Sequence, residues 1–171
     1  MKKVVERIIS LTVNGREYEF TVGNKEGQMP EQETLIHTLR DRLHLTGAKI
    51  GCDQGVCGCC TVIMNDEAIS SCMTLTCDCD EANITTIEGL ADQDTGKLSG
   101  LQQSFVDHSG YQCGFCTPGV IMSAEAFLRK HEDPTEDQVR EALSGNYCRC
   151  GTHYTAVESV MAYVEKREEE K

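Results

Sequence analysis

The chain lacks long apolar stretches and has few basic residues for its size. No segment approaches the roughly 20 apolar residues that span a bilayer, and the opening residues MKKVVERIIS lack the uninterrupted apolar core of a secretory signal. Only 16 basic side chains stand against 28 acidic ones, which gives a formal net charge of −12 and a surface that repels phosphate backbones. We therefore expect a cytoplasmic protein that binds neither membranes nor nucleic acids. Its charged end, EKREEEK, is expected to be a solvated tail.

The sequence also lacks the features of an active site. We find no convincing nucleophile or general base, and the histidines are scattered along the chain. The glycines of residues 51–58 alternate with cysteines, so they do not form a phosphate-binding loop. We therefore predict that this chain carries no catalytic residue and no substrate pocket.

Cysteine, in contrast, is abundant, with 11 residues. A reducing cytosol disfavours structural disulfides, and an odd number of cysteines cannot be fully paired. Metal ligation is therefore the leading explanation, and the spacing of the cysteines indicates which metal they bind.

The first cysteine set occupies the loop GCDQGVCGCCT, residues 51–61. Cys52, Cys57 and Cys60 have the C-x4-C-x2-C spacing of a plant-type [2Fe–2S] site, and Cys72 supplies a fourth thiolate. The glycines of the loop have no Cβ, so they let the backbone wrap a cluster. Zinc sites favour paired C-x2–4-C knuckles instead, so a two-iron cluster is the preferred interpretation.

Three further thiols leave part of this assignment open. Cys77 and Cys79 are alternatives to Cys72 as the fourth ligand, and we prefer Cys72 because it closely follows a strand. Cys59 adjoins Cys60, but the x2 spacing within the loop selects Cys60. We predict that Cys59 packs as a small hydrophobic residue and that the other two thiols are structural or exposed.

The second cysteine set consists of Cys113 and Cys116, in a C-x2-C pair, and of Cys148 and Cys150, in a C-x-C pair. On spacing alone, a zinc site remains an alternative. Thr117 and a proline follow directly, which predicts a helix that starts there with the threonine as its cap. The positive end of that helix would stabilise an anionic cluster.

Hydrophobic periodicity divides the chain into two halves. In the first half, an Asn-Gly turn between alternating apolar residues predicts a hairpin. In the second half, four segments have helical periodicity, and an Asp-Pro-Thr-Glu cap signal introduces the third. The predicted elements are a hairpin over residues 7–22, a helix over 33–43, strands over 61–64 and 84–87, and helices around 98–105, 120–128, 139–143 and 157–164. We therefore expect an α+β fold with a boundary near residues 80–92.

Taken together, the motifs GCDQGVCGCCT, QCGFCTPG and GNYCRCGTHY resemble those of the small iron–sulfur subunit of xanthine dehydrogenase-type molybdenum hydroxylases. The resemblance covers about residues 6–165. Relatives include the small subunits of carbon monoxide dehydrogenase, 4-hydroxybenzoyl-CoA reductase and nicotinate dehydrogenase. It implies a β-grasp ferredoxin-like [2Fe–2S] domain at residues 1–82, followed by a four-helix [2Fe–2S]-binding domain at residues 83–171.

The resemblance also implies a function, that of an electron-transfer subunit of an oxidoreductase. Substrate would be oxidised at a molybdenum–pterin cofactor on a large subunit. Electrons would then cross the cluster of the helical domain and the plant-type cluster, and reach FAD on a medium subunit. The complex would be a heterotrimer or a dimer of heterotrimers, with molybdopterin in its cytosine dinucleotide form. Gln112 and Cys150 are the residues that the family motifs place next to the pterin.

Two departures from the family and two alternatives remain. The family usually has a small residue between the second and third ligands of the first set, and this chain has Cys59 there. Many relatives continue CRC with Thr-Gly-Tyr, whereas this chain has Gly-Thr-His-Tyr. The additional His153 is expected to reshape the turn as a solvated residue at the start of a helix. The alternatives to a subunit are a free-standing two-cluster ferredoxin that shuttles electrons, and a zinc-stabilised interaction module.

Overall fold

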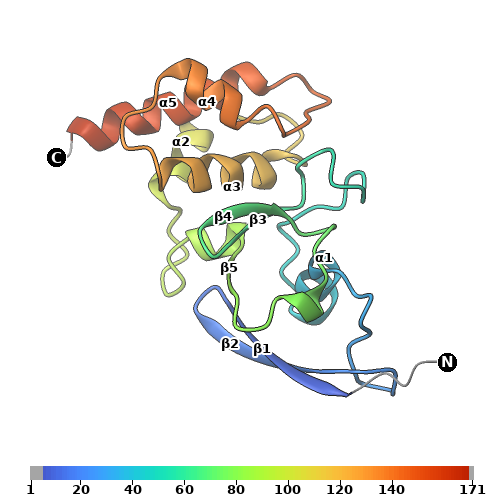
Figure 1. Ribbon diagram of the computed structural model, residues 1–171. Coiled ribbons are helices and arrows are strands. Elements are labelled where there is room, and N and C mark those ends of the chain that lie inside the picture. The colour runs from blue at the N-terminus through green and yellow to red at the C-terminus, as the bar shows by residue number, and fades with distance from the viewer. Residues whose placement is uncertain (1–5, 170–171) are drawn as a thin grey trace.

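The structure, a computed structural model, describes residues 6–169 of the chain (Figure 1). Residues 1–5 belong to the segment predicted to hold no secretory signal and lie outside the described residues, as do residues 170 and 171 of the charged end. Within residues 6–169, none of the helices has the length and apolar character that crossing a membrane requires.

The first half folds around a mixed five-stranded sheet in the order β2-β1-β5-β3-β4. The strands are β1 (Arg7–Val13), β2 (Arg16–Val22), β3 (Thr61–Met64), β4 (Glu67–Ser70) and β5 (Asn83–Thr85). β1 and β2 form the predicted hairpin, whose turn residues Asn14 and Gly15 both have positive φ, at 52° and 78°. β5 joins the two hairpins, because it pairs in parallel with β1 and antiparallel with β3. It ends earlier than the strand predicted over 84–87, since the chain turns into a 3-10 helix at Ile87–Leu90.

The helix predicted over residues 33–43 is shorter and irregular. α1 covers only Leu35–His37, and the next five residues, Thr38–Arg42, form a π-helix. The helix starts later than predicted because Thr34 has an extended backbone, with φ of −80° and ψ of 153°, and forms an isolated antiparallel β-bridge with Leu75 in the segment after β4. Contacts between distant segments therefore override the helical periodicity here.

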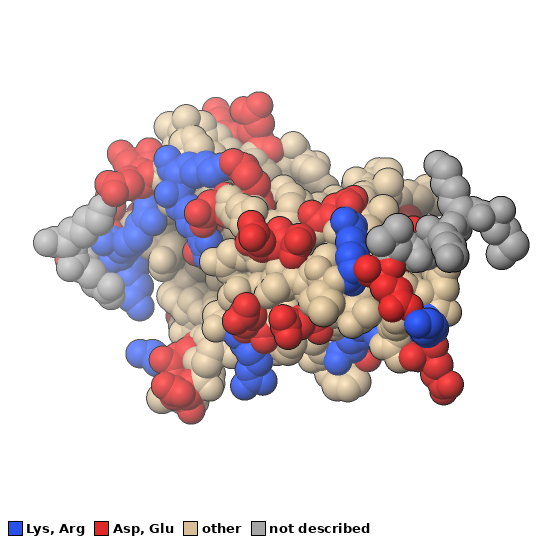
Figure 2. Space-filling model, turned by 60° about the horizontal axis from the view of Figure 1, so that its bottom comes forward, with Lys and Arg blue, Asp and Glu red and all other residues tan. Residues whose placement is uncertain are grey.

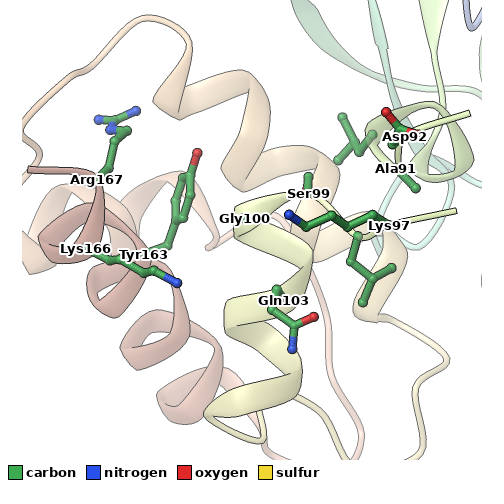
Figure 3. A pocket seen from close by; sticks show the side chains of 11 residues that line it. Ala91, Asp92, Lys97, Ser99, Gly100, Gln103, Tyr163, Lys166 and Arg167 are labelled. Atoms are coloured by element: carbon green, nitrogen blue, oxygen red, sulfur yellow. The ribbon is translucent and has the colours of Figure 1, made fainter. Parts of the chain in front are cut away.

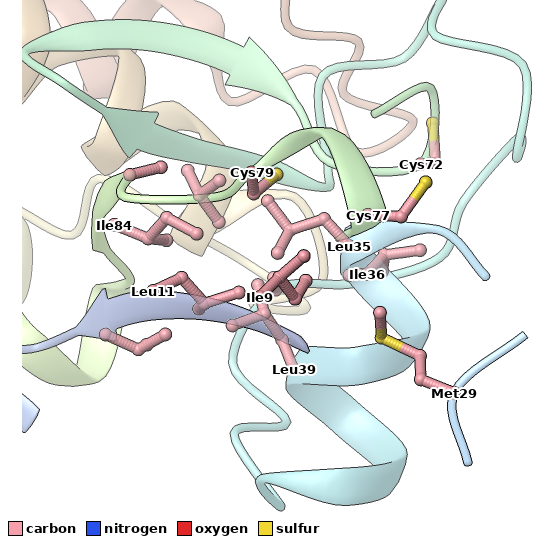
Figure 4. Close-up of a cluster of buried hydrophobic side chains, with 14 of the residues drawn as sticks. Ile9, Leu11, Met29, Leu35, Ile36, Leu39, Cys72, Cys77, Cys79 and Ile84 are labelled. Atoms are coloured by element: carbon pink, nitrogen blue, oxygen red, sulfur yellow. The ribbon is translucent and has the colours of Figure 1, made fainter. Parts of the chain in front are cut away.

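The core of the first half lies between the sheet and this helical segment (Figure 4). Alternate residues of β1 point into it, so Ile9 and Leu11 are 1% exposed whereas Ile8 is 67% exposed. Leu35 and Leu39 cover the core from the helical side, and both are fully buried. This packing holds the sheet edge that carries the first cysteine set.

The second half contains the four predicted helices. They are α2 (Gly100–Asp107), α3 (Thr117–Leu128), α4 (Glu136–Ala142) and α5 (His153–Glu169). The cap signal before α4 is confirmed, because Thr135 and Gln138 form a reciprocal capping box. The predicted cap at Thr117 is wrong by one residue: α3 begins at Thr117, and Cys116 occupies the cap position. The α+β class is confirmed.

The charged end of the chain is helical as far as it is described. α5 continues to Glu169, so most of the run EKREEEK extends this helix and does not form a separate tail. Basic Lys166 and Arg167 lie in its last turn, where they complement the negative end of the helix.

The two halves pack against each other through α3, which lies across β3 and β4 (Figure 1). Met122 and Ala126 of α3 form a buried cluster with Ile63 of β3. Because α3 starts directly after the second C-x2-C pair, this contact brings the second cysteine set close to the sheet edge that carries the first.

Candidate iron–sulfur centres

The four cysteines predicted as the first set converge at one edge of the sheet. Cys52 and Cys57 lie in the loop before β3, Cys60 directly precedes that strand, and Cys72 follows β4. Their thiols form two neighbouring pairs, Cys52 with Cys57 and Cys60 with Cys72. The Cys52 thiol also contributes to the raised pKa of Cys72, so the two pairs lie within electrostatic range of each other.

Glycines allow the loop to close around these thiols. Gly55 and Gly58 have φ of +70° and +69°, a region that side chains with a Cβ rarely adopt. Gly51 leaves room for a sulfur, since a Cβ added there would lie 2.9 Å from Sγ of Cys57. The predicted wrapping role of the glycines therefore has a geometric basis at these positions.

The loop offers N–H donors to anionic sulfur. Gln54 and Val56 each donate a backbone N–H to Sγ of Cys52 at 3.4 Å. Together with a further N–H and the adjacent thiol, these donors lower the pKa of Cys52 to about 7. Burial, followed by the neighbouring Cys60 thiol, raises the pKa of Cys72 to about 11. Backbone donors of this kind stabilise the sulfurs of a cluster and tune its potential.

The alternative fourth ligands point elsewhere. The Cys77 thiol donates to the carbonyl of Glu31 at 3.3 Å, and the Cys79 thiol donates to a carbonyl four residues earlier at 3.4 Å. Both side chains are buried with the core of the first half (Figure 4), and burial raises the pKa of Cys79 to about 11. The thiol that the structure places beside Cys60 is that of Cys72.

The second set also consists of two neighbouring pairs. Cys113 and Cys116 lie between α2 and α3, and Cys148 and Cys150 lie between α4 and α5. The Cys113 thiol neighbours that of Cys150, and the Cys116 thiol neighbours that of Cys148. Two loops between helices thus supply two thiols each.

The start of α5 contributes a donor that the sequence analysis missed. Oγ1 of Thr152 lies 3.1 Å from Sγ of Cys148. Burial opposes ionisation of Cys148, but the hydroxyl and backbone N–H of Thr152 outweigh it and lower the pKa of this thiol to about 7. Burial raises the pKa of Cys116 to about 12. A threonine directly before a helix is a cap signal. This signal could have drawn attention to Thr152 at the start of α5.

The thiol pairs suit a two-iron cluster. A [2Fe–2S] cluster takes four thiolates, two on each iron, and each set offers two pairs at one site. Among residues 6–169, no group of three or more His, Cys, Asp or Glu side chains is arranged to hold a single metal ion.

The residues predicted to approach a pterin lie at the open side of the second set. Gln112 is exposed and adjoins Cys113, which is exposed as well. Cys150 is partly exposed, on the neighbouring loop. His153 is exposed at the start of α5, which is the solvated position expected for it.

A cavity of about 270 Å³ joins the two sets. Cys52 and Cys57 line it from the first set, and Cys116 and Cys148 line it from the second. Cys59 also lines this cavity and is 5% exposed, in agreement with its predicted packing as a small buried residue. The two sets therefore line one shared cavity.

Hydrogen bonds fix the two loops relative to each other. Nδ2 of Asn146, which is 3% exposed, donates to the carbonyl of Gly58 at 3.1 Å. The N–H of Tyr147 donates to the carbonyl of Cys57 at 2.8 Å. Gly119 of α3 permits this approach, because a Cβ there would lie 2.1 Å from the Gly58 oxygen. The two hydrogen bonds link residues about 90 positions apart, and the sequence analysis missed them.

We expect Asn146→Ala to destabilise the protein by about 1–2 kcal/mol, because it removes a buried hydrogen bond and leaves a small cavity. For a chain of this size, that corresponds to a fall in Tm of roughly 2–8 °C, which thermal unfolding of the cluster-loaded protein can measure. The exposed Asn24→Ala is the matched control and should leave Tm unchanged. Equal Tm values for both variants would show that the Asn146 contact is unimportant.

Exposed apolar side chains flank each set. Val56 and Met73 are 74% and 61% exposed beside the first set, and Phe115 and Tyr147 are 46% and 60% exposed beside the second. Elsewhere, acidic and basic side chains are interspersed, as on the face shown in Figure 2. Large apolar side chains gathered at a site are typical of surfaces that contact another protein.

A larger cavity lies apart from both cysteine sets (Figure 3). It measures about 680 Å³ and lies between the start of α2, the end of α5 and the loop that precedes α2. Lys97, Lys166 and Tyr163 line it, and no cysteine does. It thus contributes nothing to the two candidate centres.

Comparison with known proteins agrees with the geometry of the two sets. Residues 11–91 match the family described as "2Fe-2S iron-sulfur cluster binding domain", and residues 86–161 match the family described as "[2Fe-2S] binding domain". The chain is 45% identical over 153 residues to the nicotine 6-hydroxylase small subunit of Paenarthrobacter nicotinovorans, covering 90% of this chain and 87% of that one. It is 44% identical over 133 residues to the nicotinate dehydrogenase small FeS subunit of Eubacterium barkeri, covering 78% and 83%.

Solved structures have the same fold. Quinoline 2-oxidoreductase from Pseudomonas putida 86 contains a chain that superposes with a TM-score of 0.84 at 37% identity, covering 96% of this chain and 97% of that chain. The aldehyde oxidoreductase from Desulfovibrio desulfuricans superposes with a TM-score of 0.85 at 34% identity, but this chain spans only 17% of its length. The protein therefore belongs to the family of small iron–sulfur subunits of xanthine dehydrogenase-type molybdenum hydroxylases, with two [2Fe–2S]-binding domains and an electron-transfer role within an oxidoreductase complex.

Proposed function

We propose that this chain relays electrons between a molybdenum–pterin subunit and an FAD subunit. The observation that carries the proposal is the cavity shared by the two cysteine sets, because two redox centres on one relay must lie close together. When bound, each [2Fe–2S] cluster supplies one-electron redox chemistry. The chain itself contributes thiolates, N–H donors and a fixed separation between the two loops.

The ligands proposed for the first cluster are Cys52, Cys57, Cys60 and Cys72, and those proposed for the second are Cys113, Cys116, Cys148 and Cys150. In the first set, the neighbouring thiols Cys52 with Cys57 and Cys60 with Cys72 would together hold the cluster. In the second set, the neighbouring thiols Cys113 with Cys150 and Cys116 with Cys148 would do so. We place the boundary between the two domains at residues 82 and 83, directly before β5, which pairs with strands of the first domain.

The exposed residues beside each cysteine set indicate where each partner subunit would dock. We propose that the molybdenum–pterin subunit docks at the second set, where Gln112 and Cys150 would approach the pterin and exposed Phe115 would be covered. The FAD subunit would dock at the first set and cover Val56 and Met73. A heterotrimer or a dimer of heterotrimers, the cytosine dinucleotide form of the pterin and a cytoplasmic location complete the proposal.

A free-standing ferredoxin or a zinc-stabilised module is not favoured, because the relatives at 44–45% identity are named as small subunits of hydroxylase and dehydrogenase enzymes. Affinity purification of the tagged full-length chain from its native host tests the proposal. Molybdenum and FAD should co-purify on two further polypeptides. A chain that purifies alone, with its clusters loaded and no partner at any salt concentration, would contradict the subunit role.

A further inference from the structure

Ser71 is a buried polar residue directly before Cys72, and neither candidate centre accounts for it. It is 0% exposed, and its hydroxyl donates to the carbonyl oxygen of Cys60 at 2.6 Å. A buried hydroxyl needs a hydrogen-bond partner, but this partner belongs to a proposed ligand on a different segment of the chain. Ser71 therefore joins the segment that carries Cys72 to the one that carries Cys60.

The ladder between β3 and β4 cannot by itself bring these two thiols together. Its last pair is Thr61 with Ser70. If the ladder continued, Ser71 would lie opposite Cys60, and Cys72 would follow one step further along. Because successive side chains of a strand point to opposite faces, Cys60 and Cys72 would then lie on different faces of the sheet. The chain must therefore leave the ladder before Cys72.

The chain leaves the ladder in a turn that Ser71 anchors. The N–H of Met73 donates to the carbonyl of Ser70 at 2.9 Å, which closes the turn. The N–H of Ser71 lies 3.4 Å from the carbonyl oxygen of Cys60, longer than an ordinary ladder bond, whereas its hydroxyl donates to the same oxygen at 2.6 Å. The carbonyl of Ser71 also accepts the N–H of Ile36 at 3.1 Å. The hydroxyl thus provides the strong hydrogen bond that the backbone loses where the ladder ends.

We propose that Ser71 is a positioning residue of the first cluster, whose hydroxyl fixes the turn that carries Cys72 against the strand end that carries Cys60. The inference rests on the proposed function, since it takes these two cysteines as ligands of that cluster. Residues that hold metal ligands in place affect how firmly the metal is bound, and replacing one typically weakens binding about 10–100-fold. Without the hydroxyl, only the long backbone contact joins the two segments, so the Cys72 thiolate is released more readily.

The rate at which each cluster is lost to an iron chelator, followed by EPR of reduced samples, tests the proposal on the cluster-loaded full chain. The signal of the first cluster is identified as the one that Cys57→Ser abolishes. Ser71→Ala should lose this signal about tenfold faster than the wild type, and it should lose the second signal at an unchanged rate. Ser71→Thr keeps the hydroxyl and should restore the wild-type rate.

Ser104→Ala is the matched control. Ser104 is 7% exposed, and its hydroxyl donates to the carbonyl oxygen of Ser159, also at 2.6 Å, in the helical half. Because each alanine variant removes one buried hydrogen bond, both should lower Tm. Only Ser71→Ala should accelerate loss of the first signal, which separates positioning of a ligand from a general effect on stability.

Equal loss rates of the first signal in the wild type and Ser71→Ala would overturn the proposal, as would equal acceleration of both signals. Ser71→Thr tests it independently of whether the alanine variant folds, since a tenfold faster loss of the first signal from the threonine variant would overturn it too. Iron analysis separates this failure from that of the proposed function. About four irons per chain with equal loss rates would refute only the role of Ser71, whereas about two irons per wild-type chain would refute the two-cluster assignment itself and, with it, this role.

Discussion

Replacing Cys57 with serine is expected to abolish the first [2Fe–2S] cluster and to leave the second in place. Iron binds thiolate in preference to a hydroxyl, and Cys57 forms one of the two thiol pairs of the first set. Iron content should fall from about four to about two per chain, and one of the two EPR signals should disappear. In the assembled enzyme, the molybdenum centre should stay reducible by substrate, while electron flow to FAD should stop.

The matched control is Cys77→Ala, which removes a thiol that donates to a backbone carbonyl and takes no part in either set. It should retain both EPR signals. Unchanged turnover of the Cys57→Ser enzyme with an external acceptor that takes electrons from the flavin would contradict the order in which the two sets are placed along the electron path.

Replacing Cys150 with alanine is expected to have the opposite pattern, with loss of the second cluster and retention of the first. Cys150 is the partner of Cys113 in the second set, and alanine offers no ligand in its place. Substrate should still bind at the molybdenum subunit. Its electrons should reach neither the first cluster nor FAD. Because Cys150 is also proposed to contact the pterin, the affinity of the chain for that subunit should decrease.

Cys79→Ala is the control for this variant, since Cys79 is buried in the first half and hydrogen-bonded to the backbone. Far-UV circular dichroism of both variants should match the wild type, which separates loss of the cluster from loss of the fold. Survival of both EPR signals in Cys150→Ala would show that the ligand set of the second half is wrong.

Local patterns predicted the fold well where local chemistry decides it. The Asn-Gly turn of the first hairpin and the capping box at Thr135 are both present, because each depends on a few neighbouring residues. The irregular helix at residues 35–42 was not predictable in the same way. Its start is set by the β-bridge of Thr34 to the segment after β4, which is about 40 residues further along the chain.

In the candidate centres, too, the features set by neighbouring residues were predictable and those set by distant segments were not. Cysteine spacing alone predicted three thiols of the first set and all four of the second, because clusters are bound largely by short loops. The spacing left Cys72, Cys77 and Cys79 as competing choices, and only their directions in the folded chain separate them. The link between Asn146 and Gly58 could not be predicted, since it depends on how α3 packs across the sheet.

The most direct test of the two-cluster assignment is the content of iron, zinc and acid-labile sulfide per chain, together with EPR of the reduced protein. We predict about four irons and four sulfides, no stoichiometric zinc, and two distinct signals of [2Fe–2S] type. About two irons with one zinc and a single signal would contradict it, because the second set would then hold a structural metal and the relay between two partner subunits would have no second centre.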